Sequence, residues 1–104
     1  MSTRNDQLSE ALRTAAAEFL SRESNRLSLI TVTAVRMSEG GHHATIFVTV
    51  LPEDMEEQAL QFANRNRGEF GKFFETKVRA RIPRVEFVID RGEKMRQRLD
   101  ELTN

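Results

Sequence analysis

The two adjacent histidines, His42 and His43, are of the residue type most often found in metal and catalytic sites. Neighbouring residues of a strand point to opposite faces, so these two imidazoles cannot jointly hold one metal ion. The sequence contains no cysteine, which excludes thiolate ligands and disulfide bonds. We therefore expect a polar hairpin end here, with neither a metal site nor a catalytic residue.

The sequence also lacks the short motifs of common enzyme classes. No serine lies in a nucleophile-elbow pattern, and neither a Walker motif nor a G-x-G-x-x-G motif occurs. The acid pairs Glu56-Glu57 and Asp100-Glu101 lie in sequence typical of a solvated surface. These observations predict a protein that is not an enzyme and that uses no cofactor and no small-molecule substrate.

Charge is the feature that points to a binding function. The net charge is +0, but residues 64–84 carry seven Lys and Arg side chains against two acidic ones, Glu69 and Glu75. A local basic stretch can bind phosphate even on a neutral protein, although a solvated helix face gives the same pattern. The candidate RNA-binding residues are this basic set and one glycine: Arg65, Arg67, Gly68, Lys72, Lys77, Arg79, Arg81 and Arg84.

The elements before this stretch follow from hydrophobic periodicity. Apolar residues over 5–23 recur at helical spacing, which predicts an amphipathic helix. Residues 27–38 and 44–51 are rich in β-branched residues and predict two strands. Gly40-Gly41 can form the turn between them, so we expect an antiparallel hairpin.

The basic stretch itself is predicted to be a helix interrupted in its middle. One helix begins after Pro52 and continues to about residue 65, and helical spacing resumes over 70–81, where Pro83 stops it. Gly68 and Gly71 lie at the interruption, and each glycine inside a helix costs about 1 kcal/mol relative to alanine. The expected kink residues are Asn66, Arg67 and Gly68.

Residues 85–90 alternate in a way that predicts a third strand. The order α-β-β-α-kink-α-β predicts an α+β domain, with a three-stranded sheet covered on one face by helices. The 104 residues suit a single domain, 1–104. The part after about residue 91 is expected either to fray or to form a short helix with Met95, Leu99 and Leu102 inward.

Location follows from what the sequence does not contain. No apolar run approaches the length of a membrane span, and the first ten residues are polar and unlike a signal peptide. We therefore expect a cytoplasmic protein that does not enter a membrane.

Gly68-Glu69-Phe70-Gly71 is a G-x-x-G sequence between two predicted helices, the place where KH domains clamp nucleotides. The inner residues argue against such a clamp here. Glu69 would repel phosphate, and Phe70 continues the apolar stripe of the helix, so we expect it in the core.

The chain resembles the bacterial ribosome-binding factor A family over nearly its whole length. Similar segments are the first helix, "LSEALRTAAAEFLSRE", and the strands "LITVTAVRMS" and "ATIFVTV". The helix–kink–helix follows, where the family has Ala-x-Gly and this chain has Asn66-Arg67-Gly68. A basic R-x-R at Arg79-Ala80-Arg81, a proline and the strand "RVEFVID" complete the likeness.

The resemblance implies a type II KH-like domain that is an RNA-binding ribosome assembly factor. It implies binding to the free small (30S) subunit and its 16S rRNA, late maturation including 5′-end processing of that RNA, and importance for growth in the cold. It implies action without catalysis or cofactor, as a monomer. Among the basic residues we expect Arg67, Arg79 and Arg81 to matter most, because arginine pairs with phosphate bidentately.

Two other functions fit the same residues. One is a KH-type module for single-stranded RNA elsewhere in the cell, against which Glu69, Phe70 and the absence of Tyr and Trp count. The other is a protein-interaction domain whose basic helical face binds an acidic partner.

Overall fold

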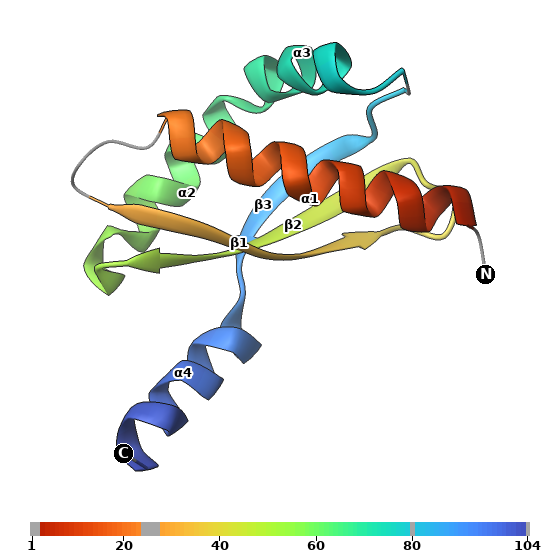
Figure 1. Ribbon diagram of the computed structural model, residues 1–104. Coiled ribbons are helices and arrows are strands. Elements are labelled where there is room, and N and C mark those ends of the chain that lie inside the picture. The colour runs from red at the N-terminus through yellow and green to blue at the C-terminus, as the bar shows by residue number, and fades with distance from the viewer. Residues whose placement is uncertain (1–2, 24–27, 80, 104) are drawn as a thin grey trace.

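The computed structural model describes residues 3–23, 28–79 and 81–103, whose arrangement Figure 1 shows. The elements follow the predicted order, with a further helix after the last strand, and confirm the α+β class. Their bounds are α1 Thr3–Glu23, β1 Leu29–Met37, β2 His43–Leu51, the 3-10 helix η1 Glu53–Met55, α2 Glu56–Arg65, α3 Arg67–Lys77, β3 Arg84–Ile89 and α4 Arg91–Thr103.

β2 is the central strand of the three-stranded sheet. β1 pairs with it antiparallel, as the hairpin prediction requires, and β3 pairs with it parallel on the other side. A parallel neighbour cannot be reached through a tight turn, so α2 and α3 form the crossover between β2 and β3. The β1–β2 register shifts between Val32 and Ala34, where Thr33 is the extra residue of a bulge.

The core lies between the sheet and the three helices α1, α2 and α3, which cover one face of it (Figure 1). Phe70 and Phe74 of α3 are fully buried. The ring of Phe70 lies 5.5 Å from that of Phe19 in α1 and 6.0 Å from that of Phe87 in β3. From β2 the core receives Ala44, Ile46, Val48 and Val50.

The helix expected over 70–81 ends earlier than predicted, at Lys77. Val78 is already extended, with φ −139° and ψ 136°. The chain must lead from the end of α3 to the start of β3, and extended backbone advances about 3.3 Å per residue against 1.5 Å in a helix. Arg79 and Arg81 therefore lie in an exposed connection and not on a helix.

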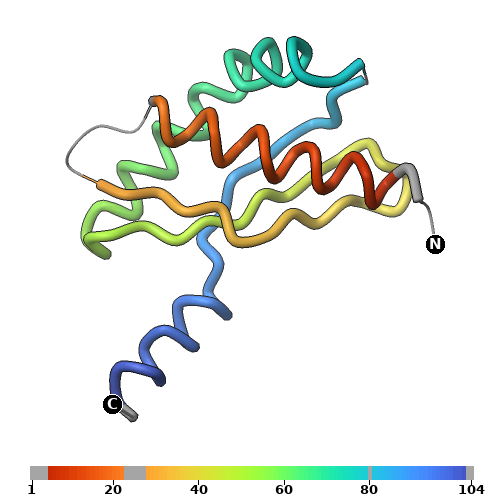
Figure 2. Tube along the Cα trace, in the orientation of Figure 1, coloured from red at the N-terminus to blue at the C-terminus, as the bar shows by residue number. Residues whose placement is uncertain are grey.

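α4 leaves the sheet after Asp90 and projects away from the other helices (Figures 1 and 2). Asp90 caps it, because its Oδ1 accepts a hydrogen bond from the backbone N of Glu93 at 2.9 Å. The expectation that the apolar residues of this segment point inward is wrong: Met95, Leu99 and Leu102 are 57%, 54% and 79% exposed. The side chains that α4 turns toward the body are charged, as described below. Among the described residues, none of the helices has the length and apolar character needed to cross a membrane.

Candidate nucleic-acid interface

The break between α2 and α3 consists of one residue, Asn66, with φ −98° and ψ 19°. Its backbone N donates to the carbonyls of Phe62 and Ala63 at 3.1 and 3.2 Å, and its own carbonyl accepts from the N of Phe70 at 2.9 Å. Its side-chain Nδ2 donates to the Phe62 carbonyl at 2.8 Å. This half-buried amide therefore has the partner that its position requires.

The expected kink at Asn66, Arg67 and Gly68 is thus narrower than predicted. Arg67 and Gly68 both belong to α3, and Gly71 lies one turn further along the same helix. The sequence from Gly68 to Gly71 is consequently the first turn of α3 and not a loop. Phe70 is fully buried, which confirms its predicted place in the core.

A side chain that the sequence did not single out, Asn64 of α2, joins the break to β3. Its Nδ2 donates to the carbonyl of Phe87 at 3.1 Å, and its Oδ1 accepts from the backbone N of Phe87 at 3.0 Å. The side-chain amide thus takes the place of a neighbouring strand at the outer edge of β3. Nothing in the local sequence marks this role, because the two residues are 23 positions apart.

Arg67 reinforces the same junction. Its Nε donates to the carbonyl of Asn64 at 2.9 Å, and its Nη1 donates to the carbonyl of Val85 at 3.3 Å. Both acceptors are neutral carbonyls, so these two bonds do not offset the positive charge of the guanidinium. Its other N–H groups are not used in these bonds. The two carbonyls therefore hold an arginine in a fixed orientation at the surface.

A groove of about 750 Å³ lies between α3 and the segment that leads into β3. We call it the α3 groove. Arg67, Lys72 and Arg84 supply positive charge around it, and Glu75 supplies one negative charge. Its lining residues are Arg67, Gly68, Gly71, Lys72, Glu75, Ile82, Pro83, Arg84 and Val85.

The two glycines give this groove a bare helical floor. A Cβ at Gly68 would meet no atom within 4 Å, and one at Gly71 would meet only Ile82 Cδ1, at an ordinary 3.5 Å. Neither glycine has a positive φ, so the fold itself does not require glycine at either position. A floor without side chains allows a ligand to come close to the backbone. Such a floor beside three cations suits a sugar–phosphate chain.

The structure divides the predicted RNA-binding set. Arg67, Gly68, Lys72 and Arg84 meet in the α3 groove. Lys77 lies on the other side of α3, where its Nζ is 3.5 Å from Glu18 and 5.2 Å from the centre of the Phe73 ring. The remaining three arginines, Arg65, Arg79 and Arg81, are exposed outside the groove.

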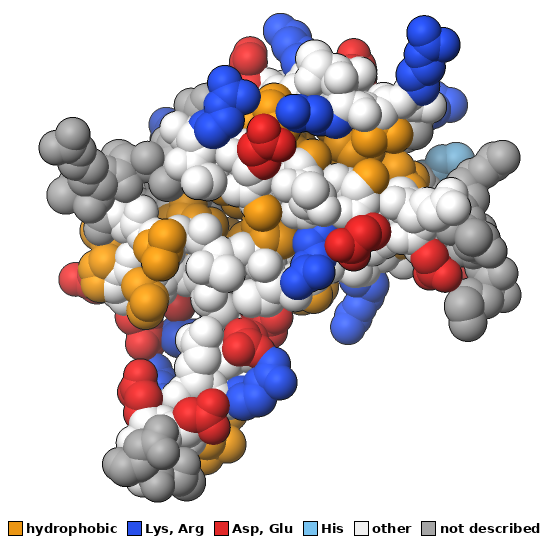
Figure 3. All heavy atoms as spheres, viewed as in Figure 1, with side chains coloured by type: hydrophobic (Ala, Val, Ile, Leu, Met, Phe, Trp, Pro, Cys, Tyr) orange, Lys and Arg blue, Asp and Glu red, His pale blue; other side chains and the backbone are white. Residues whose placement is uncertain are grey.

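In Figure 3, Lys and Arg side chains lie over α3 and the connection after it, with acidic side chains among them. Glu69 does not line the groove and lies 3.7 Å from Lys72. Beside Arg84, the hairpin end carries the two exposed histidines, and the carbonyl of His42 accepts from the Arg84 backbone N at 2.8 Å. Among the described residues, no group of three or more His, Cys, Asp or Glu side chains could hold a metal ion.

Known proteins share both the sequence and the fold. The family model for ribosome-binding factor A matches residues 4–103. The ribosome-binding factor A of Trichlorobacter lovleyi is 31% identical over an alignment of 106 positions, gaps included, which covers 95% of this chain and 84% of that one.

Solved structures give the same result. The crystal structure of ribosome-binding factor A from Thermus thermophilus superposes with a TM-score of 0.71 at 31% identity, over 82% of this chain and 94% of that one. A homology model of the Thermus thermophilus factor has been fitted into a cryo-EM map of a 30S–RbfA complex. Its coordinates superpose with a TM-score of 0.70 at 32% identity, over 88% of this chain and 97% of that one. The shared topology, with a three-stranded mixed sheet, agrees with the type II KH-like α+β fold that the resemblance implied. The match over almost the whole chain shows that it belongs to the ribosome-binding factor A family.

Proposed function

We propose that this protein binds the free small ribosomal subunit through the α3 groove and assists late maturation of its 16S rRNA. The observation that carries the proposal is the bare floor of Gly68 and Gly71 beside Arg67, Lys72 and Arg84. Support also comes from the similar Thermus thermophilus factor, which was fitted into a map of a 30S complex. We further propose that the protein acts as a cytoplasmic monomer, without catalysis or cofactor, as a single domain.

The proposed mechanism is selection of an RNA conformation by binding energy. A protein that binds one conformer of the rRNA more tightly shifts the population toward it, with no chemical step. Arg67 is suited to this because the carbonyls of Asn64 and Val85 already fix its orientation. Less side-chain entropy is then lost when the guanidinium meets phosphate. Arg79 and Arg81 extend the basic surface along the connection, and Arg65 extends it at the end of α2.

Co-sedimentation with purified free 30S subunits and with whole ribosomes tests the proposal. We expect association with free subunits only. The affinity should fall as the salt concentration rises. The slope of log binding constant against log salt concentration should become less steep by about one unit for each phosphate contact that a substitution removes. The test variant is Arg67→Ala/Arg84→Ala. Its control is Arg13→Ala/Arg36→Ala, which removes two exposed charges outside both the groove and α4.

Three outcomes distinguish the candidate functions. Loss of binding in the groove variant but not in the control supports the α3 groove as the RNA-binding surface. Equal affinity for any short single-stranded RNA would favour a general KH-type module. Absence of wild-type association with subunits at low salt would overturn the proposal and favour a protein-interaction domain.

A cold-sensitive growth assay tests the maturation step separately. In cells that depend on this protein, the groove variant should accumulate 16S rRNA with an unprocessed 5′ end at low temperature, whereas the control variant should not. Normal processing with the groove variant would refute this part of the proposal.

A further inference from the structure

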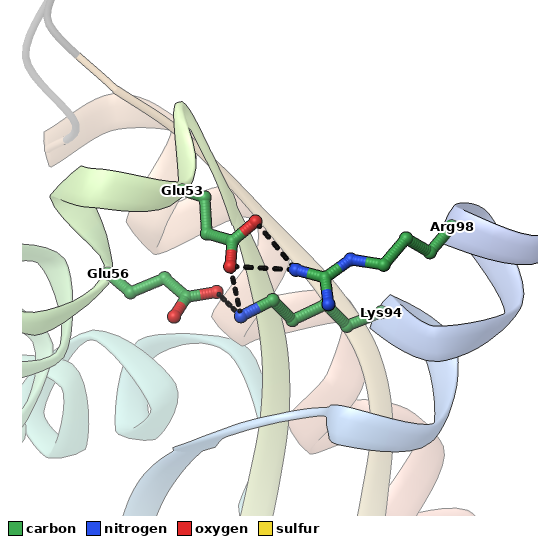
Figure 4. A network of polar contacts seen from close by, with 4 residues as sticks. All are labelled: Glu53, Glu56, Lys94 and Arg98. Atoms are coloured by element: carbon green, nitrogen blue, oxygen red, sulfur yellow. Dashed lines mark hydrogen bonds and ion pairs between the residues drawn. The ribbon is translucent and has the colours of Figure 1, made fainter. Parts of the chain in front are cut away.

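α4 is attached to the rest of the protein by ion pairs. Lys94 Nζ lies 2.9 Å from Glu53 Oε1 and 2.9 Å from Glu56 Oε2. Arg98 Nη2 lies 3.0 and 3.2 Å from the two carboxylate oxygens of Glu53. We call these four residues the α4 latch, and Figure 4 shows how the two cations converge on Glu53. No α4 residue with a described side chain belongs to the hydrophobic core, so charge holds this helix where apolar contact holds α3.

The latch engages one particular face of α4. Arg91, Lys94 and Arg98 are spaced i, i+3 and i+7, which places the three cations along one side of the helix. Lys94 is partly covered, with a side chain 21% exposed, whereas Glu53 and Arg98 are each 56% exposed. Solvent and a large ligand can therefore reach the ion pairs from outside.

The carboxylates of the latch present the acceptors that phosphate also presents. Arg98 contacts both oxygens of one carboxylate, and a phosphate group offers the same pair of oxygens. Lys94 already binds two separate anions. Glu53 and Glu56 thus pair with two cations, Lys94 and Arg98, to which the phosphates of a polyanion could bind instead.

Protonation does not open the latch near neutral pH. Hydrogen bonds from Lys94 and then Arg98 lower the pKa of Glu53 below its usual value of 4.5. The stabilisation that ionised Glu53 gives to the latch is therefore complete above pH 4.5 and is lost as the pH falls through the lowered pKa. Hydrogen bonds to Glu53 and then Glu56 raise the pKa of Lys94 above its usual value of 10.5. The stabilisation that protonated Lys94 gives to the latch is therefore complete below pH 10.5. Near neutral pH, we therefore expect the latch to respond to competing ions and not to protonation of Glu53.

We propose that α4 is a releasable arm with a second phosphate-binding face, on which Glu53 and Glu56 mask Lys94 and Arg98 until RNA phosphates replace them. Arg91 lies on the same side of the helix and is exposed. The proposal rests on the proposed function, because the polyanion that releases the arm is the RNA of the bound subunit. The α3 groove makes the first contact, and the arm then adds contacts that the free protein does not offer.

The first experiment measures affinity for free 30S subunits. Glu53→Gln/Glu56→Gln should bind several-fold more tightly than the wild type, because the arm no longer has to be unmasked. Glu10→Gln/Glu57→Gln also removes two exposed carboxylates but lies outside the latch, and it should show a smaller gain. Adding Lys94→Gln/Arg98→Gln to the unmasked variant should abolish the gain. Equal affinities of the latch and control variants would overturn the proposal.

The second experiment observes the arm directly and does not depend on ribosomes. The chain has no cysteine, so Gln61→Cys on α2 and Leu102→Cys on α4 allow two spin labels in an otherwise native protein. Inorganic polyphosphate should broaden the distance distribution of the wild-type pair to that of the Glu53→Gln/Glu56→Gln variant. An unchanged distribution would show that phosphate does not displace the carboxylates. If polyphosphate frees the arm but no subunit binds, the proposed function fails while the latch stands.

Discussion

α3 and α4 are both rich in charged residues, yet different forces attach them to the protein. α3 inserts two fully buried rings, Phe70 and Phe74, between α1 and the sheet. None of the described α4 side chains belongs to the hydrophobic core, and ion pairs of Lys94 and Arg98 with Glu53 attach the helix. Hydrophobic attachment is nearly independent of ionic strength, whereas exposed ion pairs are screened by salt. The comparison contrasts a helix held by buried rings, α3, with a helix held by ion pairs, α4; we refer to them as the platform and the arm.

The largest effect should come from removing the anchor of the platform. Phe70→Ala should destabilise the protein by about 3–5 kcal/mol, because a fully buried ring is replaced by a cavity. Leu102→Ala in α4 should change stability by less than about 0.5 kcal/mol, since that side chain is 79% exposed. Urea unfolding of both variants measures the difference. Similar losses at the two positions would contradict the contrast between the helices.

A smaller effect is expected at the junction that fixes the platform to β3. Asn64→Ala should lower the free energy of unfolding by about 1–3 kcal/mol, because the backbone N–H and carbonyl of Phe87 lose their partner at the sheet edge. Gln61→Ala, on the exposed side of the same helix, serves as the control and should be nearly neutral. The backbone amide of Phe87 should also exchange faster with solvent deuterium in the Asn64 variant alone. Unchanged exchange there would mean that the side-chain amide does not protect the edge.

Glycine variants should separate stability from binding in the platform. Gly68→Ala should stabilise the fold by about 0.5–1 kcal/mol, since no neighbouring atom obstructs the new Cβ. It should nevertheless weaken binding to 30S subunits, because the methyl group stands on the floor of the α3 groove. Gly92 is likewise the second residue of its helix, α4, so Gly92→Ala is a matched control. The control should stabilise comparably and leave binding unchanged, and equal binding by both variants would remove the case for a bare floor.

The smallest effect concerns pH, which should hardly move the arm. With labels at residues 61 and 102, the distance distribution should stay constant from neutral pH down to about 4.5, because the pKa of Glu53 is lowered by Lys94 and Arg98. Raising the salt from about 0.1 to 1 M shortens the Debye length from about 10 to 3 Å and should broaden the distribution. An arm that responded to mild acid and not to salt would point to a different attachment.

The sequence predicted those parts of the fold that local patterns determine. The β-branched runs over 27–38 and 44–51 identified the hairpin of β1 and β2, and helical spacing identified α1 and the core position of Phe70. It also predicted the basic stretch that the structure partly gathers into the α3 groove.

The features that the sequence did not predict depend on contacts between residues far apart in the chain. Asn64 could not be singled out, because its role is defined by Phe87 on another element. The spacing of Met95, Leu99 and Leu102 suggested an inward face, but the ion pairs with Glu53 and Glu56 determine which side of α4 turns to the body. Lys77 was grouped with the other cations by its position in the sequence, yet the helix turns it toward Glu18.

The parallel pairing of β2 with β3 also determines the order in which the protein can fold during synthesis. Ile46 pairs with Phe87, which follows two further helices in the chain, so β2 has no partner on that side until β3 has been made. The hairpin of β1 and β2 can form early from local contacts, whereas closing this long separation is the slow kind of step. The nascent chain therefore carries an unsatisfied strand edge while α2 and α3 are being synthesised. That edge is where pairing with a wrong strand would compete with correct folding.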